Sequence, residues 1–464
     1  MRGLILLAIF IVGIFFSNAQ QIYFSDSVIV ASKVWSKDEN KKIHYSDWKK
    51  FTSHTIDQVK DFNLSSLDDF CELGGYKSTP FSATGFFRIE KTKGRYWIID
   101  PHGHLFITKG VNSIRPGNST VVNQHLLDKF NSNANWIKST IDSLTQFGFN
   151  TAGSWSDVKS IVSYNNNVKS SGFPYTVQLS LLAGFSQKNK PKEYPILSLV
   201  FSKNFKSYLT LKINEYKDHF SNKYLLGYFS DNELPFQSDL LTDFLSINDE
   251  NDEGYIAAKE WITKHSVNIE SISKEQQKLF AGYVAEVYFS KVQECIKEAD
   301  PNHMYLGSRL HASAKNNDAI LAAAQKYIDI ISINYYGAWE LSEKHSKQWL
   351  AMNKPFFVTE FYTKGEDTKM ANMSGAGWLV KTQSERGIHY QNFCLQLMLN
   401  KNCVGWHWFR YQDNDPNDTL ADQSNQDSNK GMLDIQYNWY NSLTNKMSFL
   451  NKRIYQLIKF IDNK

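Results

Sequence analysis

Two glutamates of the 464-residue sequence stand where apolar runs end. The run Leu-Leu-Gly-Tyr-Phe at 225–229 leads to Glu233, and Phe-Phe-Val at 356–358 leads to Glu360. A carboxylate at the end of an apolar strand is costly to bury unless it has a partner or a chemical task. One such glutamate is typical of a structural ion pair. Two of them, on separate strands, favour a pair that works together.

A pair of carboxyl groups is what the hydrolysis of a glycosidic bond requires. One group, as the acid, protonates the leaving oxygen, and the other, as a carboxylate, attacks or stabilises the anomeric carbon. The two environments must push the two pKa values apart. Burial or repulsion keeps the acid protonated, and hydrogen-bond donors keep the carboxylate ionised. The sequence therefore predicts a carbohydrate-cleaving site around Glu233 and Glu360.

Regular elements must bring these two residues together. From about residue 96 onward, short apolar runs alternate with longer helix-like stretches, which indicates a parallel α/β architecture. We expect strands at 104–113, 147–155, 176–181, 225–233, 304–311, 328–337, 355–362 and 403–413. We expect helices between them, for example at 136–146, 204–219, 274–299 and 383–399. The stretches 183–200, 237–266 and 414–431 have the composition of long loops.

Eight strands with helical crossovers match the count of a (β/α)8 barrel, or TIM barrel. A doubly wound sheet can also hold eight strands, but no glycine-rich phosphate fingerprint follows the first strand. We predict an α/β fold of the barrel type over 94–464, preceded by a small N-terminal appendage over 21–93. At their junction, 85–95 and 95–105 are expected to form a hairpin with Lys93 and Gly94 at its turn.

Side chains at the carboxyl ends of barrel strands build the site in enzymes of this architecture. These positions supply the candidate substrate-binding residues, which are Asn112, Trp155, Asn232, Arg309, His311, Tyr336, His407 and Trp408. Two further tryptophans beyond strand ends, Trp339 and Trp378, are also candidates for stacking on sugar rings.

Some of these residues have a specific expected role. Asn232 is placed to hydrogen-bond a sugar hydroxyl beside the reacting carbon. Tyr336 could donate a hydrogen bond to Glu360 and hold it ionised. Arg309 or His311, from the fifth strand, could do the same. Trp408 could form the floor beneath the sugar.

Several stretches of the chain resemble the β-agarases of glycoside hydrolase family 50, among the clan A retaining glycosidases. The resembling stretches are GRYWIIDPHGHLFITKGVNSIR at 94–115, GFNTAGSWSD at 148–157, LLGYFSDNEL at 225–234, FFVTEF at 356–361 and VGWHWFRYQD at 404–413. The resemblance implies Glu233 as acid/base and Glu360 as nucleophile. It also implies retaining cleavage of β-1,4 bonds in galactans of the agarose or porphyran type. Agarases of that family usually carry a larger β-sandwich domain before the barrel than residues 21–93 can form.

Two other functions stay open at this point. Another clan A glycosidase, such as a β-galactosidase or β-mannanase, would use the same carboxylate pair. A non-catalytic polysaccharide-binding barrel would keep the fold without the reaction. In each case the partner is a polysaccharide or oligosaccharide. A net charge of +4 is too small for a chain of this length to indicate a nucleic-acid binder.

Neither a cofactor nor a metal ion is expected. His102 and His104 lie in Asp-Pro-His-Gly-His, which a turn leading into the first strand explains better than a metal site. The four cysteines are too widely spaced for a zinc pattern, and buried thiols are favoured over disulfides.

The first twenty residues, MRGLILLAIFIVGIFFSNAQ, have the pattern of a signal peptide. Arg2 supplies a positive start, 4–16 form an apolar run, and Ser-Asn-Ala at 17–19 is a small-x-small cleavage pattern. The apolar run is shorter than the roughly 20 residues that span a bilayer. We therefore expect residues 1–20 to be removed and the mature chain to be exported, to the periplasm or outside the cell, with no membrane span.

Overall fold

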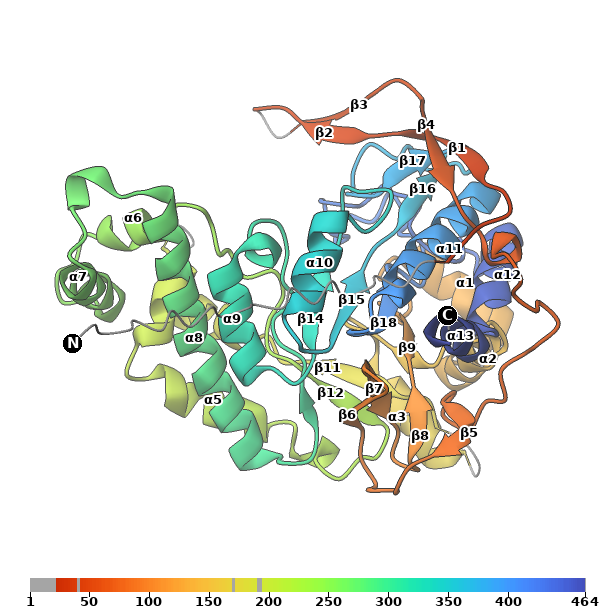
Figure 1. The fold of residues 1–464 in the computed structure, drawn as a ribbon, viewed down its shortest axis with the longest axis horizontal. Helices are drawn as coiled ribbons and strands as arrows, with labels where there is room; N and C mark the ends of the chain where they lie inside the picture. Colours follow the sequence, from red (N-terminus) through yellow and green to blue (C-terminus); the bar gives the residue numbers. More distant parts are fainter. Residues whose placement is uncertain (1–21, 40–41, 169–171, 190–193, 464) are drawn as a thin grey trace, which may run out of the picture.

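The structure is a computed structural model that describes residues 22–39, 42–168, 172–189 and 194–463 (Figure 1). The expected signal peptide at 1–20 lies outside the described residues. Within the described ranges, no helix combines the length and the apolar character needed to cross a membrane.

Eight parallel strands form a central curled sheet. Their order is β13 (Met304–Tyr305), β12 (Leu225–Phe229), β11 (Tyr175–Gln178), β10 (Thr151–Ala152), β9 (Thr108–Val111), β18 (Cys403–Trp408), β15 (Phe356–Glu360) and β14 (Ile331–Asn334). An isolated parallel bridge from Leu310, just beyond β13, to Ile333 of β14 connects the two edges of the sheet. The fold is therefore mixed α/β, and its curled parallel sheet is compatible with the expected barrel.

Helices connect consecutive strands of this sheet (Figure 1). They are α1 (Thr120–Phe130), α2 (Asn133–Gln146), α3 (Val158–Asn167), α4 (Leu181–Asn189), α5 (Phe205–Asn214), α6 (Leu240–Leu245), α7 (Glu253–His265), α8 (Lys274–Ala299), α9 (Asp318–Tyr327), α10 (Glu343–Ala351) and α11 (Gln383–Leu399), with α12 (Asn441–Asn451) and α13 (Ile454–Asp462) after the last strand. The helices expected at 274–299 and 383–399 are confirmed. Each begins with a capping box. The N-cap side chain accepts from the backbone amide three residues later, and the side chain of that residue accepts from the N-cap amide.

Three sequence expectations differ from the structure. The stretches 183–200 and 237–266, expected as loops, contain most of α4 and both α6 and α7. In α7, Asp252 caps the first turn, and Trp261 and Ile262 are buried. Tertiary packing therefore stabilises a helix that the polar sequence of this stretch did not predict. The strand expected at 104–113 is divided between two sheets, because β8 (His104–Phe106) pairs with β7 (Arg95–Ile99) and only β9 joins the central sheet.

A small antiparallel sheet covers the amino end of the central one. Its order is β5 (Tyr76–Pro80), β8, β7 and β6 (Arg88–Thr92). The predicted hairpin is confirmed: Thr92 pairs with Arg95, and Lys93 and Gly94 at its turn have φ values of 50° and 80°. Ile98 and Phe106 of this sheet pack with Leu226 and Phe357, which are apolar residues of the central strands. The boundary expected between 93 and 94 therefore falls inside a hairpin.

The chain before this sheet reaches the opposite, carboxyl end of the central strands. There β1 (Val28–Lys33) and β4 (Lys49–Ser53) form a sheet with β17 (Trp378–Val380) and β16 (Thr363–Gly365), in the order β16-β17-β1-β4 (Figure 1). Between β1 and β4, β2 (Trp35–Lys37) and β3 (Ile43–Tyr45) pair as a two-stranded ribbon, here called the N-terminal ribbon.

Two tryptophans that were candidates for sugar stacking pack against β4 instead. The Trp339 ring stacks on Phe51 at 5.3 Å, and its indole N–H donates to Ser53 at 2.9 Å. The Trp378 ring lies 5.1 Å from the same Phe51 ring. These contacts attach the N-terminal strands to the rest of the molecule.

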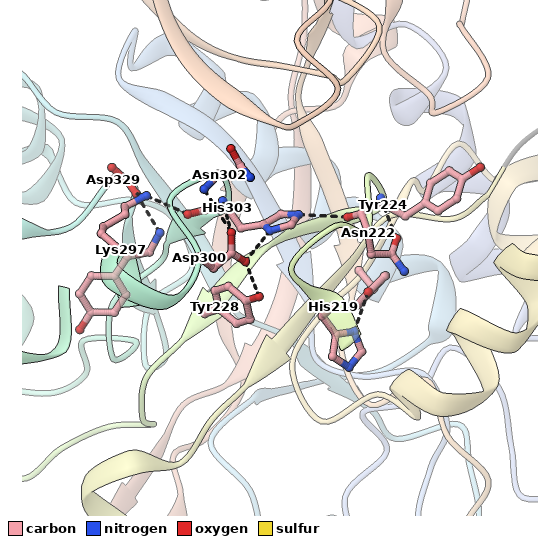
Figure 2. A network of polar contacts seen from close by, with 11 residues as sticks. His219, Asn222, Tyr224, Tyr228, Lys297, Asp300, Asn302, His303 and Asp329 are labelled. Carbon is pink, nitrogen blue, oxygen red and sulfur yellow. Dashed lines mark hydrogen bonds and ion pairs between the residues drawn. The ribbon is translucent and has the colours of Figure 1, made fainter. Parts of the chain in front are cut away.

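A buried polar network joins the end of α8 to β12 (Figure 2). One carboxylate oxygen of Asp300 accepts from His303 at 2.6 Å and from Tyr228 at 2.7 Å, and the His303 ring contacts the Asn222 carbonyl at 3.0 Å. Burial acts to raise the pKa of Asp300, but the hydrogen bonds from His303 and Tyr228 outweigh it, and the net pKa is lowered. The ionised carboxylate therefore stabilises the fold.

We predict that Asp300→Ala lowers the free energy of unfolding by about 3–5 kcal/mol, because it leaves buried donors without their acceptor. Since the folded-state pKa lies below the unfolded one, the contribution of Asp300 is present above the unfolded pKa and is lost as pH falls through the folded pKa. Urea unfolding at neutral and acidic pH measures both effects. Glu343→Gln, which breaks an exposed ion pair with Lys347, is the control and is expected to change stability by less than about 1 kcal/mol. Equal effects of the two substitutions would contradict the prediction.

Candidate active site

A cleft of about 520 Å³ at the carboxyl end of the central strands holds both glutamates. Its lining residues come from at least six segments of the chain: Trp35, Ile43, Trp155, Asn232, Glu233, His311, Ala312, Lys315, Tyr336, Gly337, Glu360, Tyr362, Gly375, Ala376, Phe409, Asp422, Ser424 and Asn425. A groove beside α6 is larger, at about 1020 Å³, but neither glutamate lines it. The smaller cleft is therefore the candidate site, because both glutamates line it.

The backbone at three positions of the site adopts a conformation that side chains rarely allow. Trp155, Glu233 and Arg309 have φ values of 66°, 50° and 49°. A left-handed conformation costs free energy for residues other than glycine, and such residues cluster at functional sites. At Glu233 the turn is fixed by its own amide, which donates to the Ser308 carbonyl at 3.1 Å.

Glu360 ends β15 as a buried carboxylate with two strong donors. Arg309 donates to one of its oxygens and the Tyr336 hydroxyl to the other. Only 7% of its side chain is exposed. Burial raises the pKa of Glu360, and the Glu233 charge adds to this effect; the Arg309 charge and the Tyr336 hydrogen bond oppose it without reversing it, so the net pKa is raised. Arg309 and Tyr336 therefore counteract the cost of ionising a buried acid.

Glu233 has a different and more open environment. Its side chain is 31% exposed, and one oxygen accepts from the Asn334 amide group at 2.7 Å. Asn334 is held in turn by Thr359, whose hydroxyl donates to it at 2.7 Å. The His311 ring lies 3.9 Å from the same Glu233 oxygen. The two carboxylates of the cleft thus differ in their exposure, in the charged groups beside them and in their hydrogen bonds.

The structure brings six of the residues singled out from the sequence together as lining of the cleft: Glu233, Glu360, Trp155, Asn232, His311 and Tyr336. It places four others behind the lining. Arg309 is fully buried against Glu360, with its guanidinium 5.1 Å from the Trp155 ring. Trp408 is also fully buried, and its indole N–H donates to the Lys430 carbonyl at 3.2 Å.

Asn112 and His407 form a polar layer below the cleft. The Asn112 amide donates to the Thr359 carbonyl at 2.6 Å, and His407 contacts the Thr108 hydroxyl at 2.9 Å. Burial, helped by the Arg309 charge, lowers the pKa of His407 to about 3, so its ring is neutral. Asn112 thus bonds the backbone of the residue before Glu360, and His407 is an uncharged group within the electrostatic reach of Arg309.

Other residues in or beside the cleft were not selected from the sequence. Asn334, which bonds Glu233 without lining the cleft, could have been, because it stands two residues before Tyr336 near the end of the sixth expected strand. Trp35 and Ile43 carry no such signal, since they lie far before the first strand of the central sheet. Their place in the cleft depends on how the N-terminal ribbon packs.

One group of possible metal ligands lies apart from the cleft. Within the described part of the chain, Cys71, Asp100 and His104 place ligand atoms within 4.8 Å of one another. Asp100 accepts from the amides of His102 and His104, both at 2.9 Å, and from the Cys71 thiol at 3.1 Å. These contacts stabilise the turn expected before the first strand. All four cysteines are free thiols: three are buried and Cys71 is half-buried.

These features describe a parallel α/β protein with two unlike carboxylates in one cleft at the carboxyl end of its sheet. Among solved structures, the crystal structure of BpGH50 superposes with a TM-score of 0.83 and 32% sequence identity, over 96% of this chain and 98% of that one. The agarase AgWH50C shares the fold, with a TM-score of 0.69 and 20% identity over 85% of this chain and 67% of that one.

Curated sequences agree with this likeness. Beta-agarase B of Vibrio sp. (strain JT0107) is 23% identical over 89% of this chain, and the chain spans only 54% of that protein. Beta-agarase A of the same strain is 31% identical over 27% of this chain and 13% of its own length. No family model matches the chain. The chain belongs to glycoside hydrolase family 50, the β-agarase family that the sequence resembles.

The contact between Arg309 and Glu360 leads to a prediction about the protonation of Glu360. Replacing Arg309 by Met removes the positive charge that lowers the pKa of Glu360, so this pKa is expected to rise further. Arg309→Lys keeps the charge and is expected to give a smaller rise. Carboxyl ¹³C NMR titration of glutamate-labelled protein measures the shift, and Glu360→Gln assigns the signal. An unchanged Glu360 titration in Arg309→Met would contradict this account of the site.

Proposed function

We propose that this chain is a retaining glycoside hydrolase, with Glu360 as nucleophile and Glu233 as acid/base. The observation that carries the proposal is the unlike pair of carboxylates in one cleft of a family 50 chain. Arg309 and Tyr336 hold Glu360 in a fixed position and favour its charged form, as a nucleophile requires. Glu233 is more open to the cleft, where it can give a proton to a leaving oxygen and later take one from water.

The reaction follows from these positions. The Glu360 carboxylate attacks the anomeric carbon, and the bond from this carbon to the leaving oxygen breaks as Glu233 protonates that oxygen. A glycosyl ester on Glu360 results. Glu233, now ionised, removes a proton from water, which attacks the same carbon and releases Glu360. Two inversions at one carbon give net retention. We further propose that the central sheet is the (β/α)8 barrel of a clan A enzyme, with Glu233 and Glu360 at the carboxyl ends of its fourth and seventh strands.

The proposed substrate is a β-linked galactan of the agarose or porphyran type, cleaved at β-1,4 bonds. It is supported by the relatives named as agarases and by the aromatic lining of the cleft, which includes Trp155 and Phe409. Aromatic faces bind the apolar C–H faces of sugar rings. The alternatives are another clan A activity, such as a β-galactosidase or β-mannanase, and a non-catalytic polysaccharide-binding barrel.

The division of the chain belongs to the same proposal. Residues 1–20 act as a signal peptide, 21–93 as an appendage that shares its last hairpin with the barrel domain, and 94–464 as the catalytic domain. Export would bring the enzyme to a polysaccharide too large to enter the cell.

Substitution of each glutamate tests the two roles. Glu233→Ala is expected to lower kcat on galactan by about 10²–10⁴-fold, the usual contribution of a general acid and base. Glu360→Ala is expected to lose more, because the covalent step disappears. Azide distinguishes the roles: it should restore turnover of an activated aryl glycoside in both variants, with a β-glycosyl azide from Glu233→Ala and an α-glycosyl azide from Glu360→Ala. Wild-type turnover by Glu360→Ala would refute the nucleophile assignment.

The substrate and the stereochemistry are tested on the wild-type chain. We expect reducing ends to be released from agarose or porphyran, in preference to carrageenan, mannan and nitrophenyl glycosides. ¹H NMR of the first minutes of reaction should show the β-anomer of the product. An initial α-anomer would rule out retention. Cleavage of mannan alone would select another clan A activity, and binding of galactan without any release would select the non-catalytic barrel.

A further inference from the structure

The N-terminal ribbon forms a wall of the cleft that holds the two glutamates. Trp35 of β2 and Ile43 of β3 line the same cleft as Glu233 and Glu360. Neither residue belongs to the central sheet or to its connections. The cleft is therefore completed by a part of the chain that lies outside the proposed catalytic barrel.

The ribbon is fixed to the loop that follows β16. The indole N–H of Trp35 donates to the Ala376 carbonyl, and the Tyr45 hydroxyl donates to the Asn372 carbonyl. Ala376 itself lines the cleft. Both strands of the ribbon thus have one aromatic side chain bonded to backbone of the same short loop, 372–376.

A buried lysine holds the ribbon and this loop together. Lys364 is fully buried, and its ammonium group donates to the Tyr45 hydroxyl at 2.6 Å. The same group donates to the carbonyls of Ser374 at 2.9 Å and Gly375 at 3.0 Å. Burial lowers the pKa of Lys364 to about 7, against the opposing charge of Asp427. A buried amino group is costly unless polar groups surround it, so this lysine favours the arrangement in which all three acceptors meet.

The loop is also fixed from its other side. The Asp427 carboxylate accepts from the amides of Met373 at 2.9 Å and Ser374 at 2.8 Å, and the Asn429 amide donates to the Asn372 side chain at 2.8 Å. Asp427 and Asn429 belong to the long segment after β18, which also supplies Asp422, Ser424 and Asn425 to the cleft. The ribbon therefore docks on a rigid support.

Trp35 has the properties of a sugar-binding residue. Its side chain is half-buried, its polar edge is engaged by Ala376, and it lines the cleft. A tryptophan held in this way loses little conformational freedom when a sugar ring stacks on it. Trp155, which is 37% exposed, lines the same cleft. The cleft thus presents two tryptophans from distant parts of the chain.

We propose that Trp35 is a specificity-determining residue that binds a sugar ring of the substrate, and that Lys364 is the positioning residue that holds the N-terminal ribbon in place. The inference deepens the proposed function and rests on it, because the ligand is the oligosaccharide that Glu233 and Glu360 are proposed to cleave. It assigns part of the binding site to the segment before the barrel.

Steady-state kinetics on agarose-derived oligosaccharides tests Trp35. Trp35→Ala is expected to raise KM by about tenfold, the loss of one stacking contact, and to leave kcat within about twofold. Trp35→Phe should restore most of the affinity. The matched control is Trp48→Ala: Trp48 lies on the same N-terminal segment, between the ammonium groups of Lys33 and Lys381 at 4.8 Å and 5.4 Å from its ring, and does not line the cleft. It should leave KM unchanged.

Lys364 is tested in the same assay. Lys364→Met should raise KM as Trp35→Ala does, and Lys364→Arg should recover part of it. The double variant Trp35→Ala/Lys364→Met should be no worse in KM than Trp35→Ala, since both act through one contact. Additive effects of the two substitutions would overturn the positioning role of Lys364.

Binding in the absence of turnover separates the two levels of the proposal. In Glu360→Gln, the oligosaccharide should quench tryptophan fluorescence, and Trp35→Ala should weaken binding about tenfold. If the wild type hydrolyses galactan and Trp35→Ala keeps wild-type KM and binding, this inference is wrong and the proposed function stands. If the oligosaccharide binds through Trp35 but the wild type hydrolyses no substrate, the proposed reaction is wrong and the inferred binding role of the ribbon stands.

Discussion

The arrangement of the cleft depends on one contact, the buried carboxylate of Glu360 held by Arg309 and Tyr336. A carboxylate with 7% of its side chain exposed is costly to ionise unless donors and a positive charge compensate. Arg309 is itself fully buried, so the cost of its own burial must also be met. Each of the two groups makes the burial of the other tolerable. Removing either leaves an uncompensated charge at the carboxyl end of the sheet.

The surroundings of this pair follow from the same requirement. Arg309 packs between the aromatic rings of Trp155 and Phe229, at 5.1 Å and 5.6 Å, which favours a guanidinium that has little water around it. Below it, His407 is neutral, because burial and the Arg309 charge both lower its pKa. Glu233, across the cleft, has an amide donor and more solvent in place of a bonded cation. The Arg309–Glu360 pair thus makes the two carboxylates of the cleft unlike in their surroundings, which supports the division of roles proposed above.

The N-terminal part of the chain has two structural tasks at opposite ends of the central sheet. Its second half supplies β5 and β6 to the antiparallel sheet that covers the amino end, where Ile98 of β7 packs with Leu226. Its first half extends to the carboxyl end and adds β1 and β4 to strands that follow β15. A buried lysine and several backbone carbonyls fix the N-terminal ribbon there. The described residues before 94 are therefore bonded to the rest of the fold at both ends of the central sheet, although no motif in their sequence indicates this.

Local patterns in the sequence were enough to predict the alternation of strands and helices and to select the two glutamates, because periodicity and apolar runs are local properties of the chain. They also determined the turn at Lys93 and Gly94 and the capped starts of α8 and α11, where adjacent residues bond one another. The donation from Tyr336 to Glu360 was also predicted and is confirmed. The tertiary structure was needed to select Arg309 over His311 as the second donor, and to show that Asn334 holds Glu233 and that Trp408 lies behind the cleft. It alone placed Trp35 beside residues more than a hundred positions away. Such contacts depend on how the central sheet curls and on where distant segments of the chain pack, and no local pattern in the sequence predicts either.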